Sequence, residues 1–216
     1  MRDDGEHAVR QWVMVAIAAT AWSALGLQLY LEILRSLANS IPMLTILVRY
    51  LSFFTITTNI AVALTLTLAL TWPQTAWGRF FSRATVQTGV ALYIAVVGVT
   101  YSMLLRHIWN PTGAQKLADV LLHDVVPVAF VLYWVIFVPK AGLRWKHALL
   151  WLLYPIAYML YTLARGVATA WWPYPFVDAN FIGFPRALGN GGLVLLAFFV
   201  LGLLAAGIGR WRARYQ

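Results

Sequence analysis

The sequence contains no cysteine, and acidic residues are scarce, with only 7 Asp and Glu in 216 residues. A chain without cysteine forms no disulfide, no thiolate metal site and no cysteine nucleophile. Charged residues of both signs make up 11% of the chain, against about 25% in an ordinary soluble domain. The chain also has no phosphate-binding loop, no dinucleotide-binding fingerprint and no His-Glu-x-x-His motif. We therefore predict no cofactor.

Apolar residues dominate instead, at 62% of the chain, and the mean hydropathy is +0.74. A soluble protein of this size cannot bury so much apolar surface in one core, and a disordered chain would not contain it. The composition therefore predicts an integral membrane protein. The net charge of +9 fits membrane topology better than nucleic-acid binding, because the basic residues lie in short gaps between apolar runs.

Six apolar stretches reach the roughly 20 residues that a membrane-spanning helix needs. Pro, Gly and Asn occupy the gaps between them, as in Asn110-Pro111-Thr112-Gly113. We predict an all-α, polytopic membrane protein with a single six-helix transmembrane domain over 1–216. The predicted helices are 12–34, 46–70, 84–105, 117–138, 147–171 and 187–208.

The orientation follows from the basic residues. The termini and the 2–3 and 4–5 loops carry ten Lys and Arg, and the other side carries six, mostly at helix ends. Because Lys and Arg are enriched in cytoplasmic loops, we expect both termini in the cytoplasm.

Ionisable residues within the apolar stretches gather toward the predicted outer half, which indicates a polar pocket there. In the fourth stretch, Asp119 and His123 are four residues apart and share a helix face. The carboxylate could hold one ring nitrogen of His123 and leave the other as a base. We expect Asp124 to face Arg106 or Arg165. Pro127 frees the carbonyl of His123 from its helical hydrogen bond.

Hydroxyl groups lie at a matching depth in the second stretch. Ser52, Thr55 and Asn59 share one face, and Ser52 lies about six residues, roughly 9 Å, from the predicted outer end. His123 lies about six residues from the outer end of the fourth stretch. A hydroxyl and a histidine at one depth could form an activated nucleophile if the helices are neighbours.

Structural roles compete with this interpretation. His123 could simply join helices, and Ser and Thr commonly line helix interfaces. A metal site from His107, His123, Asp119 and Glu32 is a weaker alternative, and we predict no metal.

Three short motifs resemble the androgen-induced protein and ADTRP-like family of multispanning membrane proteins, and in particular its bacterial members. The motifs are Arg49-Tyr50-Leu51-Ser52-Phe53, Leu122-His123-Asp124-Val125-Val126-Pro127 and Trp172-Pro173-Tyr174-Pro175-Phe176. Their order and spacing fit the family over nearly the whole chain.

The resemblance implies a hydrolase of fatty-acid esters of hydroxy fatty acids that uses an intramembrane Thr and a His. The family's His corresponds to His123. Its Thr corresponds to Ser52 in an ungapped alignment, or to Thr55 after a shift of three residues. At the directly aligned position this sequence therefore has Ser in place of Thr.

We therefore expect an intramembrane lipid-ester hydrolase in the bacterial inner membrane, with membrane lipids and a fatty-acyl substrate as its partners. Ser52 or Thr55 is the expected nucleophile, His123 the base and Asp119 its orienting group. Asn59, Arg106, Asp124 and Arg165 are candidates for substrate binding, and Asn59 or Arg165 for the oxyanion or a carboxylate. A small-anion or proton transporter and a non-catalytic lipid-binding protein are the alternatives.

Overall fold

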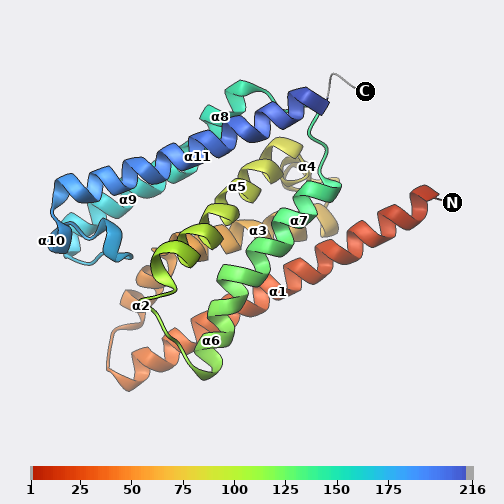
Figure 1. The fold of residues 1–216 in the computed structure, drawn as a ribbon. Coiled ribbons are helices and arrows are strands. Elements are labelled where there is room, and N and C mark those ends of the chain that lie inside the picture. The colour runs from red at the N-terminus through yellow and green to blue at the C-terminus, as the bar shows by residue number, and fades with distance from the viewer. Residues whose placement is uncertain (1, 213–216) are drawn as a thin grey trace. The chain divides into compact units, whose positions relative to one another are not determined.

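The computed structural model describes residues 2–212 and is built from helices, with no strand in that range (Figure 1). Six of its helices are long and apolar enough to cross a membrane. The all-α prediction is thus confirmed, and the fold is compatible with an integral membrane protein. The six spans run over Gly5–Ala38, Phe54–Thr71, Ala84–Leu105, Gly113–Phe137, Trp145–Thr169 and Phe184–Arg210.

The chain forms two compact units, Met1–Pro139 and Lys140–Gln216. The first unit holds four spans, and the second holds two. In the first unit, the elements are α1 (Arg2–Ala38), α2 (Met43–Leu51), α3 (Phe54–Thr71), α4 (Ala76–Phe81), α5 (Ala84–Thr100), η1 (Tyr101–Leu105), α6 (Gly113–Val120), η2 (Leu121–Val125) and α7 (Val126–Phe137).

Four helices of the first unit close into a ring. Helix α1 packs on α3, α3 on α5, α5 on α7, and α7 back on α1. The short segment η2 lies against α1, α3 and α5 as well as its own neighbours in the chain. The side of η2 that carries Leu122, which is 2% exposed, therefore faces the middle of this four-helix unit.

The second span is interrupted, whereas the sequence predicted one helix over 46–70. Helix α2 ends at Leu51, Phe53 is extended (φ −83°, ψ 128°), and α3 begins at Phe54. The Ser52 hydroxyl donates to the carbonyl of Val48 at 2.5 Å. This bond pairs one of the carbonyls that have no main-chain donor at the end of α2. No proline or glycine marks this break in the sequence.

The third and fourth spans each contain one π-helical turn, η1 and η2. In η1 the amide of Arg106 donates to the carbonyl of Tyr101 at 2.8 Å, five residues back, and in η2 Val126 donates to Leu121. Such turns rotate the residues that follow them and often lie at functional sites.

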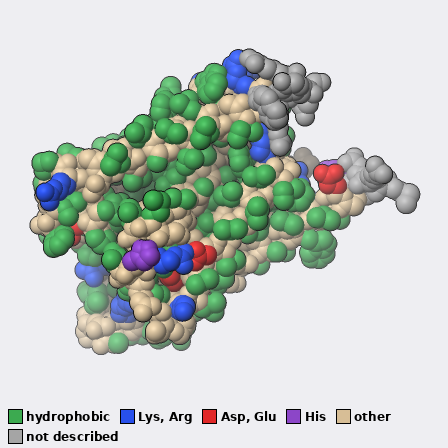
Figure 2. All heavy atoms as spheres, in the orientation of Figure 1, with side chains coloured by type: hydrophobic (Ala, Val, Ile, Leu, Met, Phe, Trp, Pro, Cys, Tyr) green, Lys and Arg blue, Asp and Glu red, His purple; other side chains and the backbone are tan. Residues whose placement is uncertain are grey.

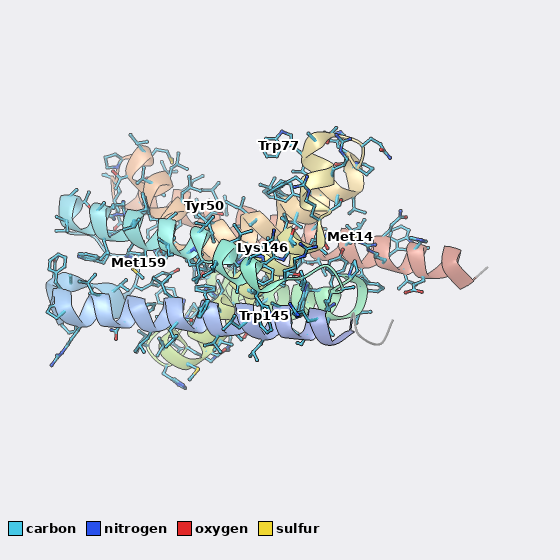
Figure 3. The ribbon with its side chains drawn as sticks, turned by 90° about the horizontal axis from the view of Figure 1, so that it is seen from above. Met14, Tyr50, Trp77, Trp145, Lys146 and Met159 are labelled. Carbon is cyan, nitrogen blue, oxygen red and sulfur yellow. The ribbon has the colours of Figure 1, made fainter. Side chains whose placement is uncertain are left out.

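The second unit contains α8 (Trp145–Trp151), α9 (Leu153–Thr169), η3 (Pro175–Val177), α10 (Ala179–Ile182) and α11 (Phe184–Arg212). Helix α11 packs against α8 and α9, and Met159 of α9 lies beside Gly191 of α11 (Figure 3). Pro155 cannot donate to Trp151, which explains the irregular turn between α8 and α9. Helix α9 ends at Thr169, two residues before the predicted end at Trp171, because Ala170 is left-handed (φ 54°).

Large apolar side chains remain exposed on the described surface, and hydrophobic groups cover much of the face shown in Figure 2. Trp12 is 73% exposed and Phe181 84% exposed. Apolar exposure of this extent suits a surface that meets lipid rather than water.

Candidate active site

The predicted pair of Asp119 and His123 is formed in the fourth span. Nδ1 of His123 lies 2.9 Å from the Asp119 carbonyl oxygen and 3.2 Å from Oδ1 of the same residue. A main-chain carbonyl oxygen only accepts hydrogen bonds, so Nδ1 carries a proton, and in the neutral imidazole Nε2 carries the lone pair. The side chain of His123 is 15% exposed and that of Asp119 is 7% exposed. The pair is therefore a largely buried, oriented imidazole with one basic nitrogen.

Tyr101 completes this pair from the neighbouring span. Its hydroxyl donates to Oδ2 of Asp119, so both carboxylate oxygens have partners. Its ring stacks on the His123 ring with centroids 3.9 Å apart and planes 14° apart. Tyr101 was not among the site residues predicted from the sequence. It lies four residues before the predicted outer end of the third stretch, and its contact with His123 follows from the packing of the third span on the fourth.

Arg106 and Asp124 form an ion pair at the edge of the same cluster. This is one of the two partners predicted for Asp124. The side chains are 42% and 34% exposed, and the Arg106 guanidinium lies over the Tyr101 ring, 4.9 Å from its centroid. Hydrogen bonding to Asp124 raises the pKa of Arg106 above its ordinary value, so the guanidinium stays charged. Arg106, Tyr101 and His123 thus lie in successive layers.

Asn59 connects α3 to the turn that carries His123. Its Nδ2 donates to the carbonyls of Thr55, at 2.8 Å, and Leu122, at 3.2 Å. The carbonyl of Leu122 needs this donor because the amide of Val126 donates to Leu121 instead and Pro127 has no N–H. The sequence predicted that Pro127 frees the carbonyl of His123. In the structure, the side chain of Asn59 binds the carbonyl of the preceding residue, Leu122.

These two bonds also fix the orientation of the Asn59 amide. Both N–H groups are directed at carbonyls, and the fully buried Oδ1 has no hydrogen-bond partner within residues 2–212. Asn59 could therefore meet a substrate only as an acceptor. That leaves it unsuited to the oxyanion role that the sequence suggested.

Ser52 and Thr55 flank the break between α2 and α3, and both are buried. The Ser52 hydroxyl donates to Val48, whereas the carbonyl of Thr55 is joined through Asn59 to Leu122, the residue before His123. Thr55 and Asn59 are four residues apart on the same face of α3, the face that meets η2. The second and fourth spans are neighbours at the depth of the histidine.

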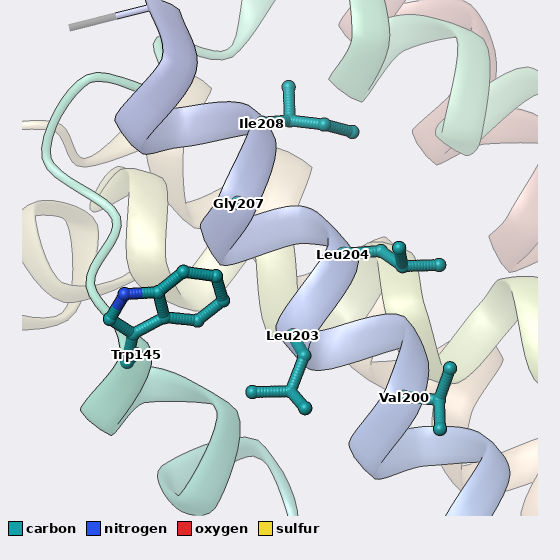
Figure 4. A pocket seen from close by; sticks show the side chains of 6 residues that line it. All are labelled: Trp145, Val200, Leu203, Leu204, Gly207 and Ile208. Atoms are coloured by element: carbon teal, nitrogen blue, oxygen red, sulfur yellow. The ribbon is translucent and has the colours of Figure 1, made fainter.

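Arg165 belongs to the second unit, on α9, and its guanidinium lies 4.2 Å from the centroid of the Trp171 ring. The same unit has an open apolar groove between α8 and α11 (Figure 4). Its lining residues are Trp145, Val200, Leu203, Leu204, Gly207 and Ile208.

Across residues 2–212, no three His, Asp or Glu side chains are grouped in a way that could hold a metal ion. His107, Glu32 and the pair of Asp119 and His123 do not form the site weighed from the sequence.

No family model, no curated protein and no solved structure matches this chain.

Proposed function

We propose that the chain is an intramembrane hydrolase of lipid esters, in which a hydroxyl of the second span attacks the ester and His123 acts as the base. The observation that carries the proposal is the buried array of Tyr101, Asp119 and His123, whose histidine lies in a turn that packs against α3, the helix that carries Thr55. A histidine held at one nitrogen by a carboxylate is the usual activating group for a hydroxyl nucleophile.

The reaction runs in two steps. The hydroxyl oxygen bonds to the ester carbonyl carbon while its proton passes to Nε2 of His123. The carbon–oxygen bond to the leaving alcohol then breaks, and His123 returns the proton to that alcohol. Water attacks the resulting acyl-enzyme with His123 again as base, and this releases the fatty acid and restores the hydroxyl. Asp119 stabilises the imidazolium formed in both steps.

Thr55 is the favoured nucleophile. Its main chain is tied through Asn59 to the residue that precedes His123, and it shares the helix face that meets η2. The Ser52 hydroxyl donates to a backbone carbonyl, an arrangement typical of Ser that ends or bends a helix. Ser52 is the second candidate.

The substrate is a long-chain ester that enters from the bilayer. The spans expose apolar side chains to lipid, and the half-exposed pair of Arg106 and Asp124 lies beside Tyr101. A polar group near the ester could exchange hydrogen bonds with this ion pair, while acyl chains stay among the apolar helix faces.

The test is hydrolysis of p-nitrophenyl dodecanoate by the protein purified in a neutral detergent. Wild type should release p-nitrophenolate, and both His123→Ala and Thr55→Val should reduce turnover at least a hundredfold. Thr55→Ser should keep turnover within about tenfold of wild type, since it retains the hydroxyl. Turnover in His123→Ala equal to that of wild type would contradict the proposal.

A further inference from the structure

The second unit holds a group of buried hydrogen-bond donors that the proposed hydrolysis does not use. Thr162 Oγ1, Arg165 Nη1 and Trp172 Nε1 are each buried and have no hydrogen-bond partner among the described residues. Thr162 is 2% exposed and Trp172 8% exposed. Buried donors in native proteins are nearly always paired, so three of them in one unit point to an acceptor that binds there.

Two of the donors, Thr162 and Arg165, share one side of α9. Thr162, Arg165 and Gly166 fall within about 100° of arc around the helix axis. Trp172 lies against this side, because a Cβ built on Gly166 would run into its indole ring. The guanidinium of Arg165 lies over Trp171, the residue next to Trp172. The left-handed turn at Ala170 brings both indoles back toward the end of the helix.

The chemistry of these groups selects an anion. Arg165 is always charged and presents N–H groups in a planar fork that fits a carboxylate or phosphate. The indole N–H only donates, and the threonine hydroxyl can donate. A ligand that offers two or more oxygen acceptors and a negative charge matches this set of donors. A neutral alcohol or ester would leave the charge of Arg165 uncompensated.

We propose that Arg165, Thr162 and Trp172 form a binding site for an oxyanion, the carboxylate or phosphate of an anionic lipid or the same group free in solution. All of these residues belong to the second unit, and the proposed hydrolysis uses none of them. Arg165 supplies the charge and two donors, Thr162 and Trp172 supply one donor each, and the indole of Trp171 covers the guanidinium.

The experiment measures binding of radiolabelled dodecanoate to the full chain in neutral detergent at pH 8, by scintillation proximity. Dodecanol competes for the micelle and apolar surfaces but carries no charge, so it serves as the matched uncharged ligand. Wild type should bind dodecanoate saturably, and dodecanol should not displace it. Dodecyl phosphate and inorganic phosphate are the two further competitors. Displacement by dodecyl phosphate alone assigns the site to a lipid headgroup, and displacement by both assigns it to the free anion.

The variants separate the site from general charge effects. Arg165→Gln should weaken dodecanoate binding by about tenfold or more, and Thr162→Val by about threefold or more. Arg186→Gln removes the same charge from an exposed residue of the same unit and should bind within twofold of wild type. Trp172→Phe provides a second donor deletion if Thr162→Val is poorly folded.

Equal binding by Arg165→Gln and wild type, or displacement of dodecanoate by dodecanol, would overturn the site. The result is independent of ester hydrolysis, because none of the probes contains an ester.

Discussion

Tyr101 and His123 stack almost face to face, with ring centroids 3.9 Å apart, although they come from different spans. The tyrosine hydroxyl binds the same carboxylate that holds the histidine. Two π-helical turns, one in each span, carry these rings. The orientation of His123 is therefore determined by a neighbouring helix as well as by its own.

Tyr101→Phe tests this shared orientation. The variant keeps the ring stack and loses the hydrogen bond to Asp119. A hydrogen bond to a charged group contributes about 1.5–3 kcal/mol, so we expect kcat for p-nitrophenyl dodecanoate to fall by about tenfold or more while KM stays unchanged. Tyr133→Phe is the matched control, because it removes a buried tyrosine hydroxyl that binds Gln87 rather than Asp119. Equal effects of the two variants on kcat would argue against a role for Tyr101.

Asp119→Asn tests the carboxylate. The variant keeps the shape of the side chain but removes the charge that stabilises an imidazolium. We expect kcat to fall by about a hundredfold or more, with the protein still folded. Asp124→Asn serves as the comparison. It removes the charge of another carboxylate in the same span, one that pairs with Arg106 at the partly exposed edge of the cluster. It should leave the apparent unfolding temperature nearly unchanged, since exposed ion pairs contribute little.

Gly98→Ala tests how closely α5 approaches the histidine turn. A Cβ on Gly98 would lie 3.2 Å from the carbonyl oxygen of His123 and 3.3 Å from Cβ of Pro127. The turn must shift by a few tenths of an ångström, and we expect turnover to fall severalfold. Gly26→Ala, in α1, meets nothing within 4 Å and should keep full turnover with unchanged or slightly higher stability. Unchanged turnover in Gly98→Ala would show that the position of the turn is not critical.

Asn59→Leu tests the bond that joins α3 to η2. The substitution removes the donor to Leu122 and to Thr55 from a fully buried position. The Thr55 carbonyl keeps its main-chain helical partner, whereas the Leu122 carbonyl is left unpaired. An unpaired buried carbonyl costs about 1–3 kcal/mol, so the apparent unfolding temperature should drop by several degrees in a fluorescence melt. Thr67→Val removes a hydroxyl that accepts an exposed hydrogen bond from the indole N–H of Trp22. It should lower the apparent unfolding temperature much less. A smaller drop for Asn59→Leu than for Thr67→Val would contradict this role of Asn59.

The sequence predicted the spans well, because a run of about 20 apolar residues can be recognised along the chain without knowing which helices pack together. It also predicted the contact between Asp119 and His123, since residues four apart on a helix meet wherever that helix packs. The break at Ser52 and Phe53 was not predictable in the same way, because no proline or glycine marks it. Tyr101 and the bond from Asn59 to Leu122 depend on which helices pack together, and a single sequence does not encode that in any local pattern.

The most direct test of the hydrolase proposal is the position of a covalent fluorophosphonate adduct, mapped by mass spectrometry on the purified protein. A fluorophosphonate phosphonylates a hydroxyl that a neighbouring base activates. The proposal predicts an adduct on Thr55 in wild type that is absent in Thr55→Val and greatly reduced in His123→Ala. If neither Thr55 nor Ser52 carries an adduct that depends on His123, the proposed nucleophile and base are contradicted.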